Sequence, residues 1–415
     1  MNGRTSPARL AIDGGAPVRA RLLPYATPDV GEAEIAAVVA VLQSGWLTTG
    51  PKVAELEAAF AARTGAREAV AVSSGTAALH GIMHVLGIGP GDEVIVPAIS
   101  FAATANCVAM VGAKPIFADV DEHTLLVTAD TIAARKTPRT RAIVGVDFAG
   151  QPCDYTALRA LAAAWRVPLV ADSCHALGAT YRDAAIGSLA DLTAFSLHAV
   201  KHVAAGEGGM VTTDNPQWAD RLRRFRNHGI DADHRARAAE GSWFYQLVEL
   251  GYNYRLTDLQ SALALVQLAR LDESLARRRA IVARYDAALA EMKFVRPLTH
   301  LPFGQSAHHL YVIRLNPECW TVDRRQVFQA LRAEGIGVNV HYVPIHLHPY
   351  YRETWGTAPG DCPVAERVYE EILSLPLFPA MSDADVADTL AALEKVWRAY
   401  VRPARPAVAV CRQAG

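Results

Sequence analysis

From Ala69 to Asp214 the sequence alternates short apolar runs rich in Val and Ile with longer Ala-rich segments. This alternation is typical of βαβ units, in which parallel strands form one sheet and the helices between them cover it. We therefore predict a large α/β domain with a mostly parallel, seven-stranded sheet. The expected strands are Ala69–Val72, Glu93–Val96, Pro115–Ala118, Ala142–Asp147, Leu169–Asp172, Leu192–Leu197 and Gly209–Thr213.

A different pattern begins at Thr257, where more than thirty residues follow without Gly or Pro. This stretch predicts one long helix that leaves the large domain. The rest indicates a smaller C-terminal α+β domain. Its expected elements are strands His309–Leu315 and Gly337–Val343, and helices Arg324–Glu334, Pro363–Leu373 and Asp383–Tyr400. The predicted division is a large domain over residues 1–260, the long helix and small domain over 261–402, and a flexible tail over 403–415.

Charge and apolar patterning exclude several classes of protein. The 41 Lys and Arg residues balance 42 Asp and Glu residues, and the net charge of −1 leaves no basic surface for nucleic acid or for an anionic membrane. We find neither the apolar core of a signal peptide nor an uncharged apolar stretch of about 18 residues. The six cysteines form no CxxC pair, so we expect reduced thiols, no disulfides and a cytoplasmic location.

Lys201 is the lysine with the most unusual surroundings. It follows the apolar strand Leu192–Leu197 and precedes three glycines in FSLHAVKHVAAGEGGM. A lysine that enters a cleft at the end of a strand can lose its proton readily and form a Schiff base with a carbonyl cofactor. A plain ion-paired lysine is the alternative.

A second candidate is the segment Ser73–Ile82, SSGTAALHGI, which follows a strand and opens a helix. Small residues at a helix N-terminus let backbone N–H groups approach a phosphate. The same residues also make an ordinary helix cap. The segment matches neither the GxxxxGK[ST] loop nor the GxGxxG fingerprint. The sequence therefore gives less support to binding of a nucleotide triphosphate or a dinucleotide at this segment.

Asp172 is the third candidate, because it closes an apolar strand in VADSCHALGA, three residues before His175. A carboxylate at the carboxyl end of a central strand lies where α/β folds place ligands. It can also cap the following helix, or form a metal pair with His175. We predict no metal, because no third carboxylate or thiolate stands at a ligand spacing.

One cofactor accounts for all three candidates. Pyridoxal 5'-phosphate needs a lysine for its aldehyde, a cradle for its phosphate, and an acid that keeps its ring nitrogen protonated. Lys201, the Ser73–Ile82 segment and Asp172 supply these three functions.

The sequence resembles the DegT-type, pyridoxal-phosphate-dependent nucleotide-sugar aminotransferases of fold type I. The resemblance spans nearly the whole chain, and within the family it points most to the 4-aminotransferases of the pseudaminic acid pathway. Its motifs are VAVSSGTAALH, VDFAGQP, VADSCHALGA, FSLHAVKHVAAGEGGMVTTD, LGYNYRLTDLQSAL, GVNVHYVPIHLHPYY and SLPLFP.

Site residues follow from this resemblance position by position. Lys201 is implied as the residue that carries the cofactor, and Asp172 as the partner of its ring nitrogen. Asn253 matches a residue that reaches the phosphate across a subunit interface, which implies a homodimer with shared active sites. The implied cofactor contacts are Gly75, Thr76, Phe101, Asp172, His175, Ser196, Lys201 and Asn253. The implied substrate contacts are Arg255, His341 and Tyr342.

The expected reaction moves an amino group from L-glutamate to the 4-keto carbon of a UDP-linked deoxy sugar, in the synthesis of cell-surface glycans. Two alternatives keep the cofactor. One is transfer to another nucleotide-linked 3- or 4-keto sugar, such as the 4-amino-4-deoxy-L-arabinose type, and the other is a non-catalytic regulatory protein. Dehydration at C3 is disfavoured, because relatives that perform it have histidine in place of the lysine that this chain keeps at Lys201.

Overall fold

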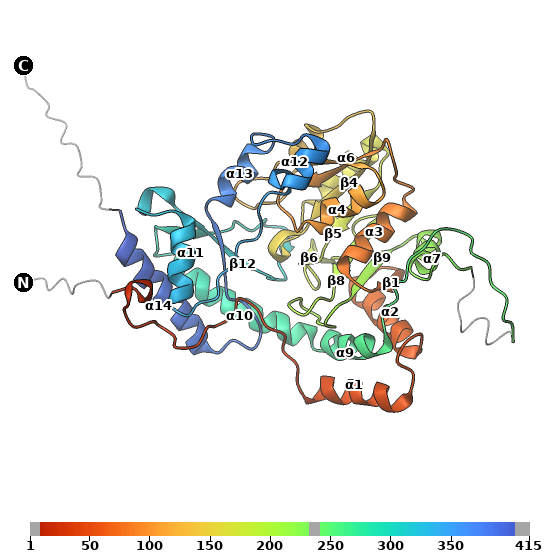
Figure 1. Ribbon diagram of the computed structural model, residues 1–415, viewed down its shortest axis with the longest axis horizontal. Helices are drawn as coiled ribbons and strands as arrows, with labels where there is room; N and C mark the ends of the chain where they lie inside the picture. Colours follow the sequence, from red (N-terminus) through yellow and green to blue (C-terminus); the bar gives the residue numbers. More distant parts are fainter. Residues whose placement is uncertain (1–8, 232–240, 403–415) are drawn as a thin grey trace, which may run out of the picture.

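The structure is a computed structural model that describes residues 9–231 and 241–402, so the expected tail 403–415 lies outside the described residues. Its main feature is a seven-stranded sheet in the order β1-β9-β8-β5-β4-β2-β3 (Figure 1). The strands are β1 Glu68–Val72, β2 Glu93–Pro97, β3 Lys114–Ala118, β4 Thr140–Val146, β5 Leu169–Asp172, β8 Leu192–Ser196 and β9 Gly209–Thr213.

All seven predicted strands are present, with ends that differ by no more than two residues. Strand β9 runs antiparallel to both of its neighbours, and the other strands run parallel to one another. The strands are buried almost throughout, which explains why continuous apolar runs mark them in the sequence. The predicted fold class, an α/β protein with a large, mostly parallel sheet, is confirmed.

Helices cover this sheet and extend from it. Figure 1 shows α1, α2 and α9 along one edge of the molecule, while α3, α4, α6 and α7 pack on the strands. Their bounds are α1 Glu32–Ser44, α2 Pro51–Thr64, α3 Gly75–Val85, α4 Ala103–Met110, α5 Ala129–Ala133, α6 Tyr155–Trp165, α7 Pro216–Phe225 and α9 Asp258–Ala269. Within the described residues no helix combines the length and apolar character needed to cross a bilayer.

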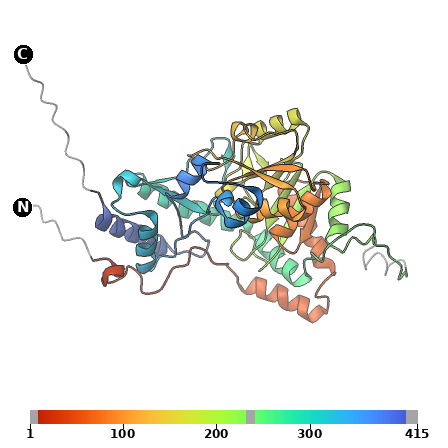
Figure 2. The same cartoon turned by 45° about the horizontal axis from the view of Figure 1, so that its top comes forward.

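A second core lies on the other side of the molecule, around a three-stranded antiparallel sheet in the order β10-β12-β13 (Figures 1 and 2). The N-terminal segment also contributes, through Leu10 and Leu23. The main elements of the second core are β10 Val295–Pro297, β12 Tyr311–Leu315, β13 Ile372–Leu375, α10 Leu271–Leu289, α11 Arg324–Ala333 and α14 Asp383–Tyr400. Smaller elements are α12 Pro349–Trp355, α13 Pro363–Tyr369, and the short strands β6 Thr180–Tyr181, β7 Ala184–Ala185 and β11 Gly304–Gln305.

The predicted long helix is two helices, α9 and α10, which meet at Arg270. Arg270 leaves the helical conformation, with φ −94° and ψ 5°, and its guanidinium binds Asp29 and the buried Glu34. Helix α10 begins in the first core with Leu271 and Leu275 and ends in the second. The predicted division after residue 260 falls inside α9.

Two further predictions were wrong. Residues 337–343 form no strand, because Asn339 alone among them pairs with a neighbour, Ser374. The predicted helix Pro363–Leu373 ends at Tyr369, and its last residues belong to β13, which pairs with β12. These residues join the sheet at its edge, where Ile372 and Leu373 are fully buried.

Candidate active site

A cavity of about 530 Å³ lies at the carboxyl ends of β4, β5 and β8, where open α/β sheets bind ligands. Its other walls come from the start of α3 and from residues 339–342, near the second core. Nine predicted site residues line it together: Gly75, Thr76, Phe101, Asp172, His175, Ser196, Lys201, His341 and Tyr342.

Lys201 lies in the loop between β8 and β9, and its side chain is half-buried. Its backbone N–H donates to the carbonyl of His198 at 2.8 Å, which makes a tight turn directly after the strand. Burial lowers the pKa of the Lys201 ammonium, and the nearby Cys174 and Asp172 partly oppose that shift. An amine in these surroundings loses its proton more readily than a surface lysine and can attack a carbonyl.

Asp172 is the last residue of β5, and its side chain is buried. The hydroxyl of Thr104 donates to Asp172 Oδ2 at 2.6 Å, and the backbone N–H of Cys174 donates to Oδ1 at 3.2 Å. Two donors therefore hold the carboxylate in place at the cavity wall. A carboxylate held this way can bind a protonated ring nitrogen.

The start of α3 lies in the segment that the sequence analysis suggested for a phosphate. Ser74 caps the helix by accepting the N–H of Ala77 at 3.0 Å, and the first turn of a helix presents unpaired N–H groups. A Cβ atom on Gly75 would lie 3.0 Å from Ser196 Cβ and 3.2 Å from Cys174 Sγ. A larger residue at this position would need Ser196 or Cys174 to shift by a few tenths of an ångström, so glycine favours the close approach of Ser196 to the helix end.

Aromatic rings line the same cavity as Lys201 and Asp172. Phe101 is 59% exposed and its ring centre lies 6.0 Å from that of Tyr342, whose hydroxyl is 3.2 Å from His175 Nε2. Burial and the charge of Lys201 lower the pKa of His175 well below its usual range, so the imidazole is neutral. A neutral ring and an exposed phenyl group offer surfaces on which a planar heterocycle can stack.

Several polar cavity residues were not named as site residues by the sequence analysis, among them Tyr25, Ser100, His309 and Asn339. Thr104, which lies behind Asp172, was missed as well. Asn339 lies within the recognised motif GVNVHYVPIHLHPYY and Ser100 directly precedes the predicted Phe101, whereas Tyr25 and His309 come from segments outside the recognised motifs. The pair His308–His309, which lies one residue before β12, was the signal that could have drawn attention to His309.

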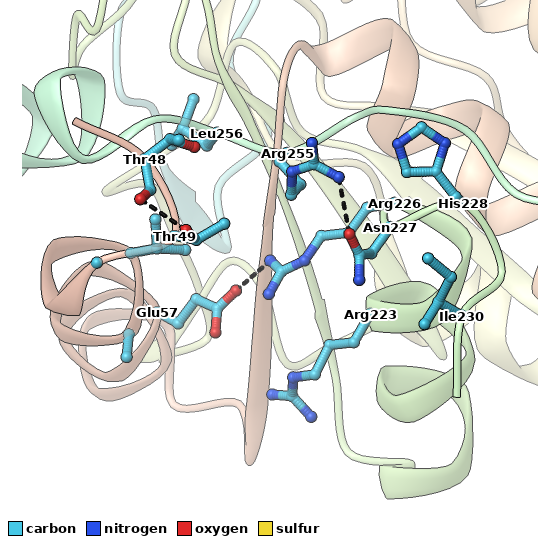
Figure 3. Close-up of a pocket in the computed structure, with 13 residues that line it drawn as sticks. Thr48, Thr49, Glu57, Arg223, Arg226, Asn227, His228, Ile230, Arg255 and Leu256 are labelled. Carbon is cyan, nitrogen blue, oxygen red and sulfur yellow. Dashed lines mark hydrogen bonds and ion pairs between the residues drawn. The ribbon is translucent and has the colours of Figure 1, made fainter. Parts of the chain in front are cut away.

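Asn253 and Arg255 do not line this cavity. Arg255 lines a second cavity of about 600 Å³ between α2 and α7, where its guanidinium donates to Asn227 Oδ1 at 2.7 Å (Figure 3). Arg226 in the same cavity binds Glu57. Asn253 forms a backbone bridge with Asn227. The predicted substrate contact Arg255 is thus separate from His341 and Tyr342 within one chain.

The residues present around the first cavity fit pyridoxal phosphate. Lys201 supplies an amine with a lowered pKa, Asp172 a fixed carboxylate, and α3 a helix N-terminus with room for a phosphate. His175 adds a buried Nδ1 atom that has no hydrogen-bond partner among the described residues. These groups surround one space of sufficient volume for a small cofactor and part of a substrate.

Comparisons with known proteins agree with this fit. The model of the DegT/DnrJ/EryC1/StrS aminotransferase family matches residues 28–394. The spore coat polysaccharide biosynthesis protein SpsC of Bacillus subtilis (strain 168) is 44% identical over 381 residues, which cover 91% of this chain and 98% of that protein.

Solved structures of similar proteins share the fold. Spr1654 from Streptococcus pneumoniae, described as a sugar aminotransferase, is 36% identical, and its PMP-form gives a TM-score of 0.86 over 91% of this chain and 99% of that chain. It has also been solved in a PLP-form. Helicobacter pylori PseC, an aminotransferase involved in the biosynthesis of pseudaminic acid, is 28% identical, with a TM-score of 0.85 over 92% of this chain and 100% of that chain.

These matches confirm the family, the enzyme class and the cofactor that the sequence predicted. The family model covers most of the chain, including the cavity residues from Gly75 to Tyr342. The chain belongs to the DegT/DnrJ/EryC1/StrS aminotransferase family, and it is a sugar aminotransferase that uses pyridoxal phosphate.

Proposed function

We propose that this enzyme transfers the amino group of L-glutamate to the 4-keto carbon of a UDP-linked deoxy sugar in the cytoplasm. The acceptor we favour is of the pseudaminic acid type, UDP-2-acetamido-2,6-dideoxy-β-L-arabino-hex-4-ulose, and the product serves cell-surface glycan synthesis. The observation that carries the proposal is the gathering of Lys201, Asp172 and the start of α3 around one cavity.

Pyridoxal phosphate, when bound, supplies a carbonyl that exchanges amino groups and a ring that accepts electrons. In this proposal Lys201 Nζ holds the cofactor at rest and later moves a proton to and from the substrate carbon. Asp172 keeps a proton on the ring nitrogen, which allows the ring to withdraw charge. Gly75, Thr76 and Ser196 bind the phosphate, and Phe101 and His175 pack on the two faces of the ring.

His341 and Tyr342 stand on the wall where we place the sugar. His341 is held by Ser374, whose hydroxyl lies 2.8 Å from its Nδ1, so its ring is fixed in orientation. Burial lowers the pKa of His341 to about 4, so it meets the acceptor as a neutral group. A neutral wall suits a deoxy sugar, whereas the anionic diphosphate needs cations from elsewhere, and Arg255 is our candidate for them.

A second copy of the chain is the proposed source of Asn253 and Arg255, because neither lines the cavity of its own chain. The segment that leads to Asn253 carries exposed apolar side chains, among them Trp243 at 84%, Leu250 at 74% and Leu247 at 68%. Large exposed apolar patches mark association surfaces. We therefore propose a homodimer whose active sites each draw on both subunits.

Two experiments test the proposal. In the first, Lys201→Ala should remove the visible absorbance of the lysine-bound cofactor and all turnover, and an enzyme that retains both would refute the assignment of Lys201.

In the second, the purified enzyme is given L-glutamate and a panel of UDP-, dTDP- and GDP-linked 3- and 4-keto sugars. Mass spectrometry and NMR then identify the amino sugars. We expect turnover of a UDP-linked 4-keto sugar, and turnover of 3-keto sugars alone would overturn the position that we propose.

A further inference from the structure

His309 contacts the amine on which the proposed function depends. Its Nε2 atom lies 3.4 Å from Lys201 Nζ, at the long end of hydrogen-bond distances, and its ring is 4% exposed. Hydrogen bonds in active sites are often long in the absence of substrate. We infer that His309 is a positioning residue whose Nε2–H donates to the unprotonated Lys201 amine and holds it toward the cavity, an inference that rests on the proposed role of Lys201.

The protonation of His309 supports a donor at Nε2. Its Nδ1 atom is buried and has no hydrogen-bond partner in residues 9–231 and 241–402. A buried N–H without a partner is rarer in proteins than a buried acceptor without one, so the single proton of the neutral ring belongs on Nε2. The donor then faces Lys201.

The groups around the ring keep it neutral. The titratable and charged groups that face it are Lys201, His175, His202 and Arg278. Burial lowers the pKa of His309 well below its usual range, and Lys201 lowers it further whenever its amine is protonated. Burial also lowers the pKa of His175 and His202, so both neighbouring rings are neutral as well. None of these four groups is a carboxylate, so nothing in this set favours an imidazolium.

The backbone around His309 is clamped on both sides. Its N–H donates to the carbonyl of Ala149 at 2.9 Å, and the buried Arg278 donates through Nη1 to the carbonyls of His308 and His309 at 3.2 and 3.4 Å. Gly150 packs so closely that a Cβ there would lie 2.8 Å from the backbone nitrogen of His308. Gly150 also has a φ of +99°, which disfavours other residues. These contacts fix the position from which the ring reaches Lys201.

Two variants separate positioning from packing. His309→Gln places an amide N–H near the position of Nε2 and keeps a donor, whereas His309→Leu keeps a similar volume and removes it. A donor to the neutral amine favours the neutral form, so its loss should raise the pKa of Lys201. His308→Asn is the matched control, because His308 has a φ of +49° that Asn tolerates.

The measurement is the pH dependence of acetylation of Lys201 by acetic anhydride in the full chain after removal of the cofactor. Peptide mass spectrometry reports Lys201, with the surface residue Lys52 as internal reference. We expect the wild type, His309→Gln and His308→Asn to give the same midpoint pH. In His309→Leu the midpoint should rise, and acetylation near neutral pH should slow by roughly three- to tenfold, the factor set by one ordinary hydrogen bond.

A midpoint in His309→Leu that is unchanged or lower overturns the inference, as does a rise of equal size in His309→Gln. If His309→Leu does not fold, as judged by circular dichroism, His309→Asn replaces it, because its shorter amide cannot reach Lys201. The test needs no cofactor or turnover. It can therefore fail while Lys201→Ala still abolishes the absorbance band, which would leave the proposed function intact.

Discussion

The hydroxyl of Thr104 donates a 2.6 Å hydrogen bond to Asp172 Oδ2, and both side chains are buried. Ser100 Oγ lies 2.6 Å from the same Thr104 oxygen. Because the single proton of Thr104 is given to Asp172, Ser100 must donate to Thr104. A chain of two hydroxyls therefore holds the carboxylate that we place against the ring nitrogen of the cofactor.

Replacing Thr104 with Val should weaken this support. The change keeps the volume but removes the donor, which costs about 1 kcal/mol in orienting Asp172. We expect the dissociation constant for pyridoxal phosphate, measured by absorbance titration, to rise roughly three- to tenfold. Thr104→Ser, which retains the hydroxyl, should stay near the wild type, and equal affinities for the two variants would contradict the prediction.

Asp147 should make the stability of the enzyme depend on pH. It is fully buried, accepts from Tyr155 and Ser173 at 2.7 and 2.6 Å, and burial raises its pKa from 3.8 to about 6. Between these values the native state binds more protons than the unfolded chain, so the free energy of unfolding contributed by this group falls as pH rises through about 6. Below about pH 4 the contribution is fully present.

The variant Asp147→Asn removes this titration. Relative to it, the wild type should lose on the order of 2 to 3 kcal/mol of unfolding free energy between about pH 4 and about pH 7. Urea unfolding followed by circular dichroism at several pH values measures the difference. The exposed residue Asp183 provides a control, since Asp183→Asn should run parallel to the wild type. A constant difference between wild type and Asp147→Asn would argue against a raised pKa.

The strands were predictable because each is a short apolar run that is buried along its length, as β2 and β5 illustrate. Whether each strand runs parallel or antiparallel to its neighbours was harder to predict, because an apolar run carries no signal of its direction. The connection from β8 to β9 is the loop that carries Lys201, and β9 returns antiparallel because no helix crosses over between them. The break at Arg270 was also hidden, because no Gly or Pro marks it.

Candidate site residues could be picked out where a polar residue ends an apolar strand, as Asp172 does, or follows one within a few residues, as Lys201 does. Their partners were not, because His309 is 108 positions from Lys201 and Thr104 is 68 positions from Asp172. Such pairs are created by tertiary packing, which leaves no periodic signal in one sequence. The wrong strand prediction for residues 337–343 also arises from tertiary packing. There His341 and Tyr342 line the cavity, and the sequence alone does not indicate this.

Arg314 and Glu371 form a buried ion pair in the second core, and breaking it should destabilise the protein strongly. Arg314 is 2% exposed and donates to Glu371 Oε2 through Nε and Nη2 at 2.9 and 2.7 Å. Arg314→Met leaves a buried carboxylate without this partner, which should cost about 3 to 5 kcal/mol in unfolding free energy.

Arg296 provides a matched control for this pair, because it approaches the same Glu371 oxygen at 3.7 Å but is 54% exposed. Arg296→Met should change stability by less than about 1 kcal/mol. The double variant Arg314→Met with Glu371→Gln should recover part of the loss, because no charge is then buried. Equal effects of the two single Arg variants in chemical unfolding would show that burial does not set the strength of this pair.

The homodimer with shared active sites that we propose predicts that two inactive variants restore activity to each other. In a mixed dimer of Lys201→Ala and Asn253→Ala chains, one site has both changes, while the other combines Lys201 of one chain with Asn253 of its partner. If the chains assemble at random from an equal mixture, half of the dimers are mixed, and about a quarter of all sites are native.

Each variant alone should be nearly inactive at limiting pyridoxal phosphate. Coexpressed chains, assayed with L-glutamate and the preferred keto sugar, should then give about a quarter of wild-type turnover. Separately expressed chains, mixed without exchange, serve as the control, and coexpressed activity no higher than theirs would mean that each site is built from one chain.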